Sequence, residues 1–283
     1  MEKISPLISA TELASLMPDE NLVLIDARTG PSIREKYNEQ HLKRAQFADL
    51  ETDLSKKEDP AKGGRHPLPD IKVFAALLGQ LGIDKSSHVV VYDDKSGANA
   101  AARFWWMMRA VGHEKIQVLD GGLQAARAAG LPLTNEVSTI KVLPAYPVNA
   151  WLLPTVDINT VATAVEDPGS KVIDVREAFR YRGESEPIDT VAGHIPGAVN
   201  IPYVANLDAN GNFLSPGELA TKYREALGDR ESNEVIVHCG SGVTACHTLL
   251  AMDHAGLGMP SLYVGSWSEW SRNDRSIATG DKP

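Results

Sequence analysis

Cysteine is scarce in this sequence, which has only Cys239 and Cys246 among its 283 residues. Two cysteines cannot build the disulfide framework of a secreted protein, so we expect reduced thiols and a cytoplasmic protein. The two residues do not form a Cys-x-x-Cys pair, which disfavours thioredoxin-type exchange and a cysteine-rich zinc site. The sequence also lacks a nucleotide-binding fingerprint, and we expect neither a metal nor another cofactor.

Long apolar runs and an excess of positive charge are missing as well. No stretch approaches the roughly 18 apolar residues that a membrane-spanning helix needs. Charged Glu2, Lys3 and Glu12 interrupt the N-terminal region, so we expect no signal peptide. The 28 Lys and Arg residues are outnumbered by 37 Asp and Glu residues, which gives a formal net charge of −9. We therefore expect neither nucleic acid nor a membrane as a partner.

What the sequence does contain is an internal repeat. Ile-Asp-Ala-Arg at 25–28 returns as Ile-Asp-Val-Arg at 173–176, and Val-Val-Val-Tyr at 89–92 returns as Val-Ile-Val-His at 235–238. The offset is about half the chain, which is the size of a domain and not the period of a solenoid. The predicted organisation is a domain at 1–136, a linker at 137–149 with two prolines, and a domain at 150–283.

Short apolar runs alternate with helical patterns in both halves. The predicted strands are 22–25, 88–92, 172–173 and 235–238, and the predicted helices are 71–81, 98–111, 217–227 and 243–255. Strands that alternate with helices form a mainly parallel sheet with helices on both faces. The predicted fold class is therefore α/β, with two domains of this kind.

The loop after the strand at 235–238 carries the most chemical information. Cys239 begins this loop and a helix is predicted shortly after it, so the thiol is expected at the carboxyl end of a parallel strand, where open α/β sheets bind ligands. Gly240 and Gly242 let the backbone curl so that N–H groups point inward as an anion nest. The nest and the helix N-terminus both favour a negatively charged sulfur, and we predict that Cys239 is a nucleophile. Cys246 lies within the predicted helix and is expected to pack.

The equivalent loop of the first half, Asp-Asp-Lys-Ser-Gly-Ala at 93–98, has no cysteine. We therefore predict a catalytically inactive first domain and a catalytic second domain. Features found in both halves, although only one half has the nucleophile, are expected to be structural. They are His41 and His194, Asp26 and Asp174, and Arg28 and Arg176.

Six short segments stand out in the two halves. They are Asp-Val-Arg at 174–176, Gly-His-Ile-Pro-Gly-Ala-Val-Asn-Ile-Pro at 193–202, Cys-Gly-Ser-Gly-Val-Thr at 239–244, Gly-Ser-Trp-Ser-Glu-Trp at 265–270, His-Pro-Leu-Pro at 66–69 and Asp-Gly-Gly at 120–122. Together they resemble the two-domain rhodanese family of thiosulfate and 3-mercaptopyruvate sulfurtransferases. The resemblance spans essentially the whole chain and implies two tandem rhodanese-like domains.

The resemblance implies a two-step sulfur transfer. The Cys239 thiolate takes a sulfur atom from a small anionic donor and becomes a persulfide, and the loop N–H groups stabilise the persulfide anion. An acceptor such as cyanide, a small thiol or a reduced thioredoxin then removes the outer sulfur. The loop residues expected to bind the donor sulfur are Gly240, Gly242, Val243 and Thr244.

The resemblance also suggests how the donor is recognised. Arg180 matches a substrate-binding arginine of the family, and an arginine can hold a carboxylate with two parallel hydrogen bonds. Ser241, His66 and Glu51 match a serine–histidine–acid relay proposed for the mercaptopyruvate enzymes. The loop resembles that subgroup too, and 3-mercaptopyruvate is the favoured donor. The second arginine of that subgroup is missing from 186–191, however, so thiosulfate stays an alternative.

The loop argues against one other kind of function and is compatible with a second. A phosphatase with a His-Cys-x5-Arg loop would need an arginine at position 245, where this chain has Ala245. A non-catalytic persulfide carrier or partner-binding module fits the same cysteine loop and stays open.

Overall fold

The computed structural model describes residues 4–283, which form two compact units. The first unit consists of residues 4–55, Pro69–Leu152 and Ala209–Phe213, and the second consists of Lys56–Leu68, Leu153–Asp208 and Leu214–Pro283. Each unit thus combines most of one half of the chain with a short piece of the other half. The boundaries at 1–136, 137–149 and 150–283 stay predictions.

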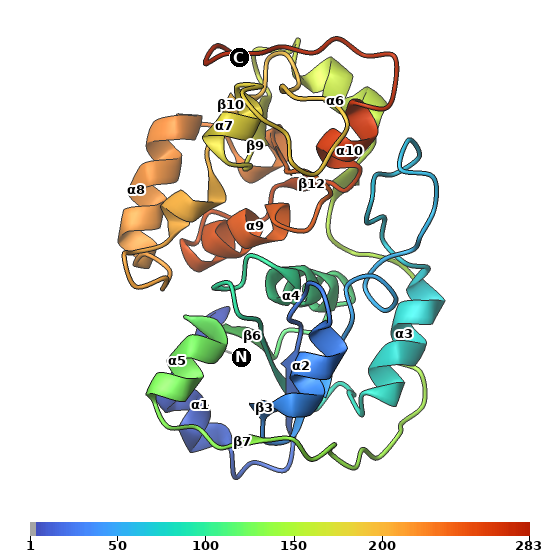
Figure 1. The fold of residues 1–283 in the computed structure, drawn as a ribbon. Helices are drawn as coiled ribbons and strands as arrows, with labels where there is room; N and C mark the ends of the chain where they lie inside the picture. The colour runs from blue at the N-terminus through green and yellow to red at the C-terminus, as the bar shows by residue number, and fades with distance from the viewer. Residues whose placement is uncertain (1–3) are drawn as a thin grey trace. The chain divides into compact units, whose positions relative to one another are not determined.

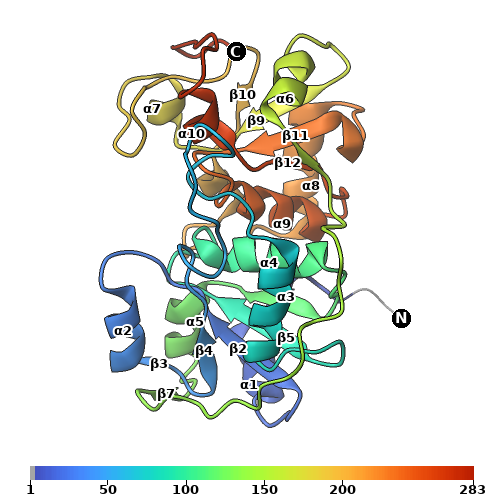
Figure 2. The same ribbon diagram turned by 90° about the vertical axis from the view of Figure 1, so that its right-hand side faces the viewer.

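The first unit is built on a parallel sheet with the strand order β1-β6-β5-β2-β4 (Figures 1 and 2). Its strands are β1 (Leu7–Ile8), β2 (Leu22–Asp26), β4 (Ala45–Phe47), β5 (His88–Tyr92) and β6 (Ile116–Leu119), and a separate antiparallel pair is formed by β3 (His41–Leu42) and β7 (Leu133–Thr134). Its helices are α1 (Ala10–Leu16), α2 (Ile33–Glu39), α3 (Ile71–Gln80), α4 (Ala100–Ala110) and α5 (Gly122–Ala128).

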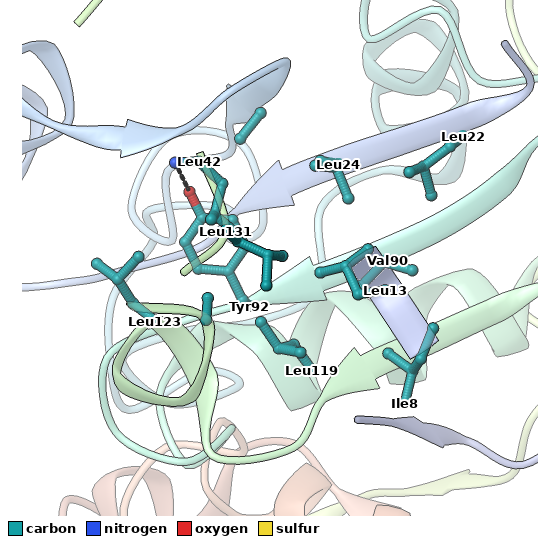
Figure 3. Close-up of a cluster of buried hydrophobic side chains, with 12 residues drawn as sticks. Ile8, Leu13, Leu22, Leu24, Leu42, Val90, Tyr92, Leu119, Leu123 and Leu131 are labelled. Carbon is teal, nitrogen blue, oxygen red and sulfur yellow. Dashed lines mark hydrogen bonds between the residues drawn. The ribbon is translucent and has the colours of Figure 1, made fainter. Parts of the chain in front are cut away.

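Helices cover both faces of this sheet. Figure 3 shows one face, where Leu13 of α1 and Leu123 of α5 pack with apolar side chains of the strands. The Tyr92 hydroxyl lies in the same cluster, where it accepts a hydrogen bond from the Leu42 N–H at 3.1 Å. On the other face, α3 and α4 meet through the rings of Phe74 and Phe104. The prediction of an α/β sheet covered on both faces is confirmed.

The second unit repeats this topology, with the strand order β8-β12-β11-β9-β10. Its strands are β8 (Thr155–Val156), β9 (Lys171–Asp174), β10 (Val199–Asn200), β11 (Val235–His238) and β12 (Ser261–Tyr263). Its helices are α6 (Ile158–Ala164), α7 (Ala178–Tyr181), η1 (Tyr203–Asn206), α8 (Pro216–Leu227), η2 (Ser232–Glu234), α9 (Ala245–His254) and α10 (Ser266–Trp270). Position by position, β8, β9, β10, β11 and β12 correspond to β1, β2, β4, β5 and β6.

In this unit α6 and α10 lie on one face of the sheet, and α8 and α9 lie on the other (Figures 1 and 2). Trp267 and Trp270 of α10 are buried in the core that α6 shares with the sheet. Their indole N–H groups donate to backbone carbonyls of Val191 and Ser276, each at 2.9 Å. Both tryptophans therefore pack inside the second unit and satisfy their polar groups there.

The predicted strands and helices are close to the observed ones. The strands at 88–92 and 235–238 have the predicted bounds, whereas the helices predicted from 98 and 243 begin at Ala100 and Ala245. Both helices start late because the preceding residues belong to the loops after β5 and β11. Among residues 4–283, no helix is long and apolar enough to cross a membrane.

Candidate active site

Cys239 stands at the carboxyl end of β11, as predicted, and it is buried. Its backbone is held on both sides by the segment after β12. The Cys239 N–H donates to the Ser266 hydroxyl at 3.1 Å, and the Cys239 carbonyl accepts from the Trp267 N–H at 3.0 Å. Ser266 has a φ of +53°, a strained conformation for a residue with a side chain, and its hydroxyl also donates to the Tyr263 carbonyl. The Cys239 backbone is thus fastened to the segment that follows the neighbouring strand β12.

The loop after Cys239 carries backbone donors without a protein acceptor. Five N–H groups of this loop have no hydrogen-bond acceptor within residues 4–283. They belong to Gly240, Ser241, Val243, Thr244 and Ala245. Most of this loop is buried, and buried backbone N–H groups require a partner. The loop therefore presents a set of donors suited to an anion beside the thiol.

The first unit shows the same loop with an anion already in it. Asp93 directly follows β5, just as Cys239 directly follows β11. The Asp93 carbonyl accepts a hydrogen bond from the Leu123 N–H, and the Cys239 carbonyl accepts the equivalent bond from the Trp267 N–H. The Asp93 carboxylate accepts hydrogen bonds from loop and helix N–H groups. These donors are Lys95 at 2.8 Å, Gly97 at 2.9 Å, Asn99 at 3.0 Å and Ala101 at 3.4 Å. Complete burial raises the pKa of Asp93 to about 6, although these backbone hydrogen bonds oppose the rise.

The structure brings His66 and Ser241 together, although they are far apart in the sequence. Both side chains are buried, and His66 Nδ1 and Ser241 Oγ are hydrogen-bonded at 2.8 Å. His66 belongs to Lys56–Leu68, the piece of the first half that forms part of the second unit. Two members of the predicted relay are therefore in hydrogen-bond contact.

The residues before His66 explain how it is held. The Gly63 N–H donates to the Glu269 carboxylate at 2.7 Å, and the Arg65 N–H donates to the Ser268 hydroxyl at 3.0 Å. Between these two bonds, the Gly64 backbone comes so close to Gly265 that a Cβ on Gly64 would lie 2.3 Å from the Gly265 carbonyl oxygen. The segment is thus fastened to the start of α10, which also holds Cys239.

Glu51, the predicted acid of the relay, is exposed and belongs to the first unit. Its backbone N–H donates to the Asp49 carboxylate at 2.7 Å. Its part in a relay stays a prediction.

Arg180 lies at the site but is more enclosed than a solvated arginine. It is 6% exposed, and its guanidinium makes a bidentate contact with the Glu186 carboxylate, with distances from 2.7 to 3.1 Å. Burial would lower its pKa, but Glu186 outweighs burial and the pKa is raised. A Cβ on Gly240 would lie 3.3 Å from Arg180 Nη2, so this charged group borders the Cys239 loop. Donor binding by Arg180 stays a prediction.

Three further residues at this place were not singled out from the sequence. The buried Asp189 carboxylate is surrounded by Arg65, Arg272 and Arg180, at 3.1, 2.9 and 3.7 Å respectively. Arg65 adjoins His66, and the two glycines before it signal a close approach of the backbone. That signal could have drawn attention to Arg65.

The acid–arginine pairs that occur in both halves are structural, as expected. The Arg28 N–H donates to the Asp26 carboxylate at 3.1 Å, and the Arg176 N–H donates to the Asp174 carboxylate at 3.0 Å. Each guanidinium also pairs with the same carboxylate inside the protein. Burial would raise the pKa of Asp174, but Arg176 outweighs burial and the pKa is lowered. Both pairs fix the turn at a strand end.

His41 and His194, which occupy equivalent positions in the two halves, are structural as well. His41 stacks on Tyr37 and His194 stacks on Tyr181, with ring centroids 3.9 and 3.7 Å apart. Each tyrosine hydroxyl donates to a backbone carbonyl, at 2.8 and 2.7 Å. Because both units contain this arrangement, it belongs to the fold and not to the chemistry of Cys239.

Cys246 is fully buried in α9, and its thiol donates to the Gly242 carbonyl at 3.4 Å. The expectation of a packed cysteine is confirmed. Across residues 4–283, no three His, Cys, Asp or Glu side chains are grouped so as to hold a metal ion.

Comparisons with known proteins agree with this geometry. The family profile described as "Rhodanese-like domain" matches residues 9–129 and again 157–273. A Pseudomonas aeruginosa protein named "Probable 3-mercaptopyruvate sulfurtransferase" is 43% identical, over 97% of this chain and 98% of its own length. The thiosulfate sulfurtransferase of Gallus gallus is 38% identical, over 84% of this chain and 80% of its own. The solved structure of 3-mercaptopyruvate sulfurtransferase from Leishmania major gives a TM-score of 0.82 at 30% identity, covering 96% of this chain and 76% of that one.

Proposed function

This chain belongs to the rhodanese family, and on that basis we propose that it is a sulfurtransferase that carries sulfur as a persulfide on Cys239. The observation that carries the proposal is the difference between the two loops. In the first unit the Asp93 carboxylate accepts from N–H groups of its loop. In the loop after Cys239, the N–H groups of Gly240, Ser241, Val243, Thr244 and Ala245 have no acceptor among residues 4–283 and are suited to an anion. A persulfide anion on Cys239 is the ligand that this loop suits.

The first step proposed is transfer of sulfur from 3-mercaptopyruvate. The Cys239 thiolate attacks the donor sulfur, a sulfur–sulfur bond forms, and the carbon–sulfur bond of the donor breaks. The electron pair of the broken bond stays on the carbon as the enolate of pyruvate. The donor thiol loses one proton in this step, and one proton must reach that carbon to give pyruvate. The products are pyruvate and a Cys239 persulfide.

Ser241 and His66 are suited to move this proton. Their hydrogen bond of 2.8 Å provides a path between the site of the enolate and the imidazole ring. Thiosulfate needs no such path, because its leaving group is sulfite and no carbon has to be protonated. The relay therefore favours 3-mercaptopyruvate as the donor, in agreement with the name of the Pseudomonas relative.

The second step returns the thiolate. A nucleophilic acceptor attacks the outer sulfur, the sulfur–sulfur bond breaks, and its electron pair stays on Cys239. Cyanide, a small thiol and a reduced thioredoxin-type protein all meet this chemical requirement. Sulfur transfer requires a donor and an acceptor, and comparing turnover rates with these acceptors would identify the preferred one.

The nucleophile is tested with two matched variants. Cys239→Ser should abolish persulfide formation and turnover, because a serine hydroxyl cannot hold the transferred sulfur. Cys246→Ser, seven residues away and packed in α9, should keep both. Persulfide is measured by mass spectrometry after donor alone, and turnover by pyruvate release with 2-mercaptoethanol. Substantial turnover in Cys239→Ser would refute the mechanism, and a persulfide without turnover in the unmodified protein would favour a carrier.

The donor is tested by comparing kcat/KM for 3-mercaptopyruvate and thiosulfate in the unmodified protein and in His66→Gln. The unmodified protein should prefer 3-mercaptopyruvate. The variant should lose about 10²- to 10⁴-fold with 3-mercaptopyruvate, the usual size of general acid–base catalysis, and little with thiosulfate. A preference for thiosulfate would support the alternative that the Gallus gallus relative suggests, thiosulfate sulfurtransferase with the same persulfide.

A further inference from the structure

The first unit contains a cavity of about 720 Å³, a volume that suits a small organic ligand. It lies at the carboxyl end of α4, where residues 111–115 form one wall and residues 146–148 and Leu152 form another. All of its lining residues belong to the first unit, whereas Cys239 belongs to the second. The cavity is therefore no part of the site that holds the nucleophile.

The end of α4 forms the first wall through a tight turn. Gly112 has a φ of +77°, the left-handed conformation that commonly ends a helix at glycine. The N–H groups of Val111, Gly112, His113 and Leu152 donate to the last four carbonyls of the helix, at 2.8 to 3.0 Å. Since each of these carbonyls has a donor, the helix end presents no unsatisfied oxygen that would repel an anion.

The segment after α5 and β7 forms the second wall. A Cβ on Gly79 of α3 would lie 2.5 Å from the Pro144 carbonyl oxygen, so this segment lies directly on α3 (Figure 2). The Tyr146 N–H donates to the Ala75 carbonyl at 2.9 Å. The Tyr146 side chain is buried, and its hydroxyl is hydrogen-bonded to His113 Nδ1 at 3.0 Å. The two walls are thus connected, and the cavity is formed without a ligand.

Positive charge dominates the lining. Lys85, Arg109 and Lys115 line the cavity, and Glu114 is the one acidic residue among the described residues that do so. Within residues 4–283, the side chains of the three cations make no ion pair and no hydrogen bond, although Arg109 is only partly exposed. Burial lowers the pKa of His113, so its ring is neutral at pH 7 and adds a hydrogen-bonding group. An excess of two positive charges therefore remains for a ligand.

The second unit has the same turn without this charge. Its helix α9 is followed by Gly256, with a φ of +73°, and the Leu257 N–H donates to the Met252 carbonyl at 2.9 Å. When Gly112 is aligned with Gly256, the residues that replace Arg109, His113 and Lys115 are Asp253, Leu257 and Met259. The turn itself thus requires neither the histidine nor the cations. The charge belongs to the first unit alone and calls for an explanation other than folding.

We propose that this cavity binds an organic anion that carries at least two negative charges on an apolar body. The planar guanidinium of Arg109 binds one charged group with parallel hydrogen bonds, and Lys85 and Lys115 add attraction. The apolar body lies against Val148 and Leu152, of which Leu152 is 67% exposed although it borders the cavity. A phosphate ester and a dicarboxylate share this chemistry. The proposal is independent of sulfur transfer through Cys239.

The test is isothermal titration calorimetry with phenyl phosphate, phenylsuccinate and inorganic phosphate. At least one of the two organic probes should bind with a Kd below about 1 mM, and inorganic phosphate should bind at least about fivefold more weakly, because it lacks the apolar body. Binding of phenyl phosphate alone would assign the cavity to phosphate esters, and binding of phenylsuccinate alone to dicarboxylates. If neither binds below about 1 mM, or if inorganic phosphate binds equally well, the proposal is overturned.

Variants locate the bound probe. Arg109→Ala should weaken binding about 10-fold or more, the usual loss of a hydrogen bond to a charged group, and Arg109→Gln should do the same while keeping the side-chain stem. Lys85→Ala and Lys115→Ala should each weaken it about two- to fivefold, as exposed ion pairs do. Lys43→Ala is the matched control, because Lys43 is an exposed cation of the first unit that does not line the cavity. An equal loss in Lys43→Ala would overturn the proposal, since binding would then depend only on net charge.

A second control separates this cavity from the surroundings of Cys239. Arg180→Ala should leave probe binding unchanged, and a loss there with none in Arg109→Ala would overturn the proposal. Arg109→Ala should still form a persulfide on Cys239 at the rate of the unmodified protein. A protein that binds the probes but forms no persulfide would refute the proposed sulfur transfer and leave this site standing, so the two failures are distinguishable.

Discussion

The close approach of Gly64 to Gly265 offers a sharp test of how the second unit holds His66. A Cβ on Gly64 would lie 2.3 Å from the Gly265 carbonyl oxygen, whereas ordinary contacts begin near 3.4 Å. Gly64→Ala therefore requires the segment to move by about 1 Å. The φ of +83° adds a conformational cost of about 1 kcal/mol for a residue with a side chain.

We expect this movement to separate His66 from Ser241. A displacement of about 1 Å would stretch their contact of 2.8 Å beyond good hydrogen-bond length. Misplacement of a catalytic group by this amount costs about 10²-fold in rate. In Gly64→Ala, kcat for 3-mercaptopyruvate should thus fall about 10²-fold, while thiosulfate turnover should fall less because sulfite needs no proton on carbon. The assay is steady-state kinetics with both donors.

Gly63→Ala is the control for backbone strain. Gly63 has a similar φ of +95°, but within residues 4–283 a Cβ there would meet only Pro67, at 3.4 Å, which is an ordinary contact. Gly63→Ala should therefore lose stability by about 1 kcal/mol and keep kcat within a few-fold. The reasoning is refuted if the two variants lose the same activity, because the clash with Gly265 would then have no part in positioning His66.

Three other outcomes follow from buried groups. The raised pKa of Asp93, about 6, means that its stabilising contribution is full below its unfolded value near 3.8 and is lost as the pH rises through 6. The free energy of unfolding, measured in urea, should decrease by up to about 3 kcal/mol across this pH range. Asp93→Asn should make this pH dependence flatter, and equal slopes in the two proteins would contradict the assignment. Asp174→Ala should destabilise by about 3 kcal/mol, because Arg176 would lose its closest partner inside the protein, and a loss below about 1 kcal/mol would argue against a structural pair. Tyr37→Phe and Tyr181→Phe should each cost about 1 kcal/mol in thermal unfolding, since each loses one hydrogen bond to a carbonyl, and unequal losses would show that the two units do not use the bond alike.

Much of the fold could be predicted because its signals are local. β-Branched runs identified the strands at 88–92 and 235–238, and the alternation with helices identified a parallel sheet covered on both faces. The place of Cys239 followed from the same pattern, since the end of β11 is defined by a few neighbouring residues. The repeat also separated residues that maintain the fold from residues expected to take part in the reaction, because the first half has Asp93 where the second half has Cys239.

The contacts around the nucleophile could not be predicted in this way. His66 meets Ser241 across 175 residues of sequence, and Arg65 meets Asp189 across 124. No periodicity connects such positions, since they meet only because Lys56–Leu68 folds with the second unit. The resemblance to a family suggested the first contact, and nothing in the sequence suggested the second.

Local signals in the sequence predict two similar α/β domains, and they place a thiol in the glycine-rich loop of only one of them. Hydrophobic periodicity and glycine-rich turns act over a few residues, so they can be read without knowing the path of the chain. Which charges surround that loop, in contrast, can be seen only in the folded protein. In the fold, the Asp93 carboxylate lies inside the nest of the first unit, Arg180 forms an ion pair with Glu186, and Arg65 lies beside Gly240. Electrostatic interactions depend on distance in space, and the folded path of the chain sets that distance.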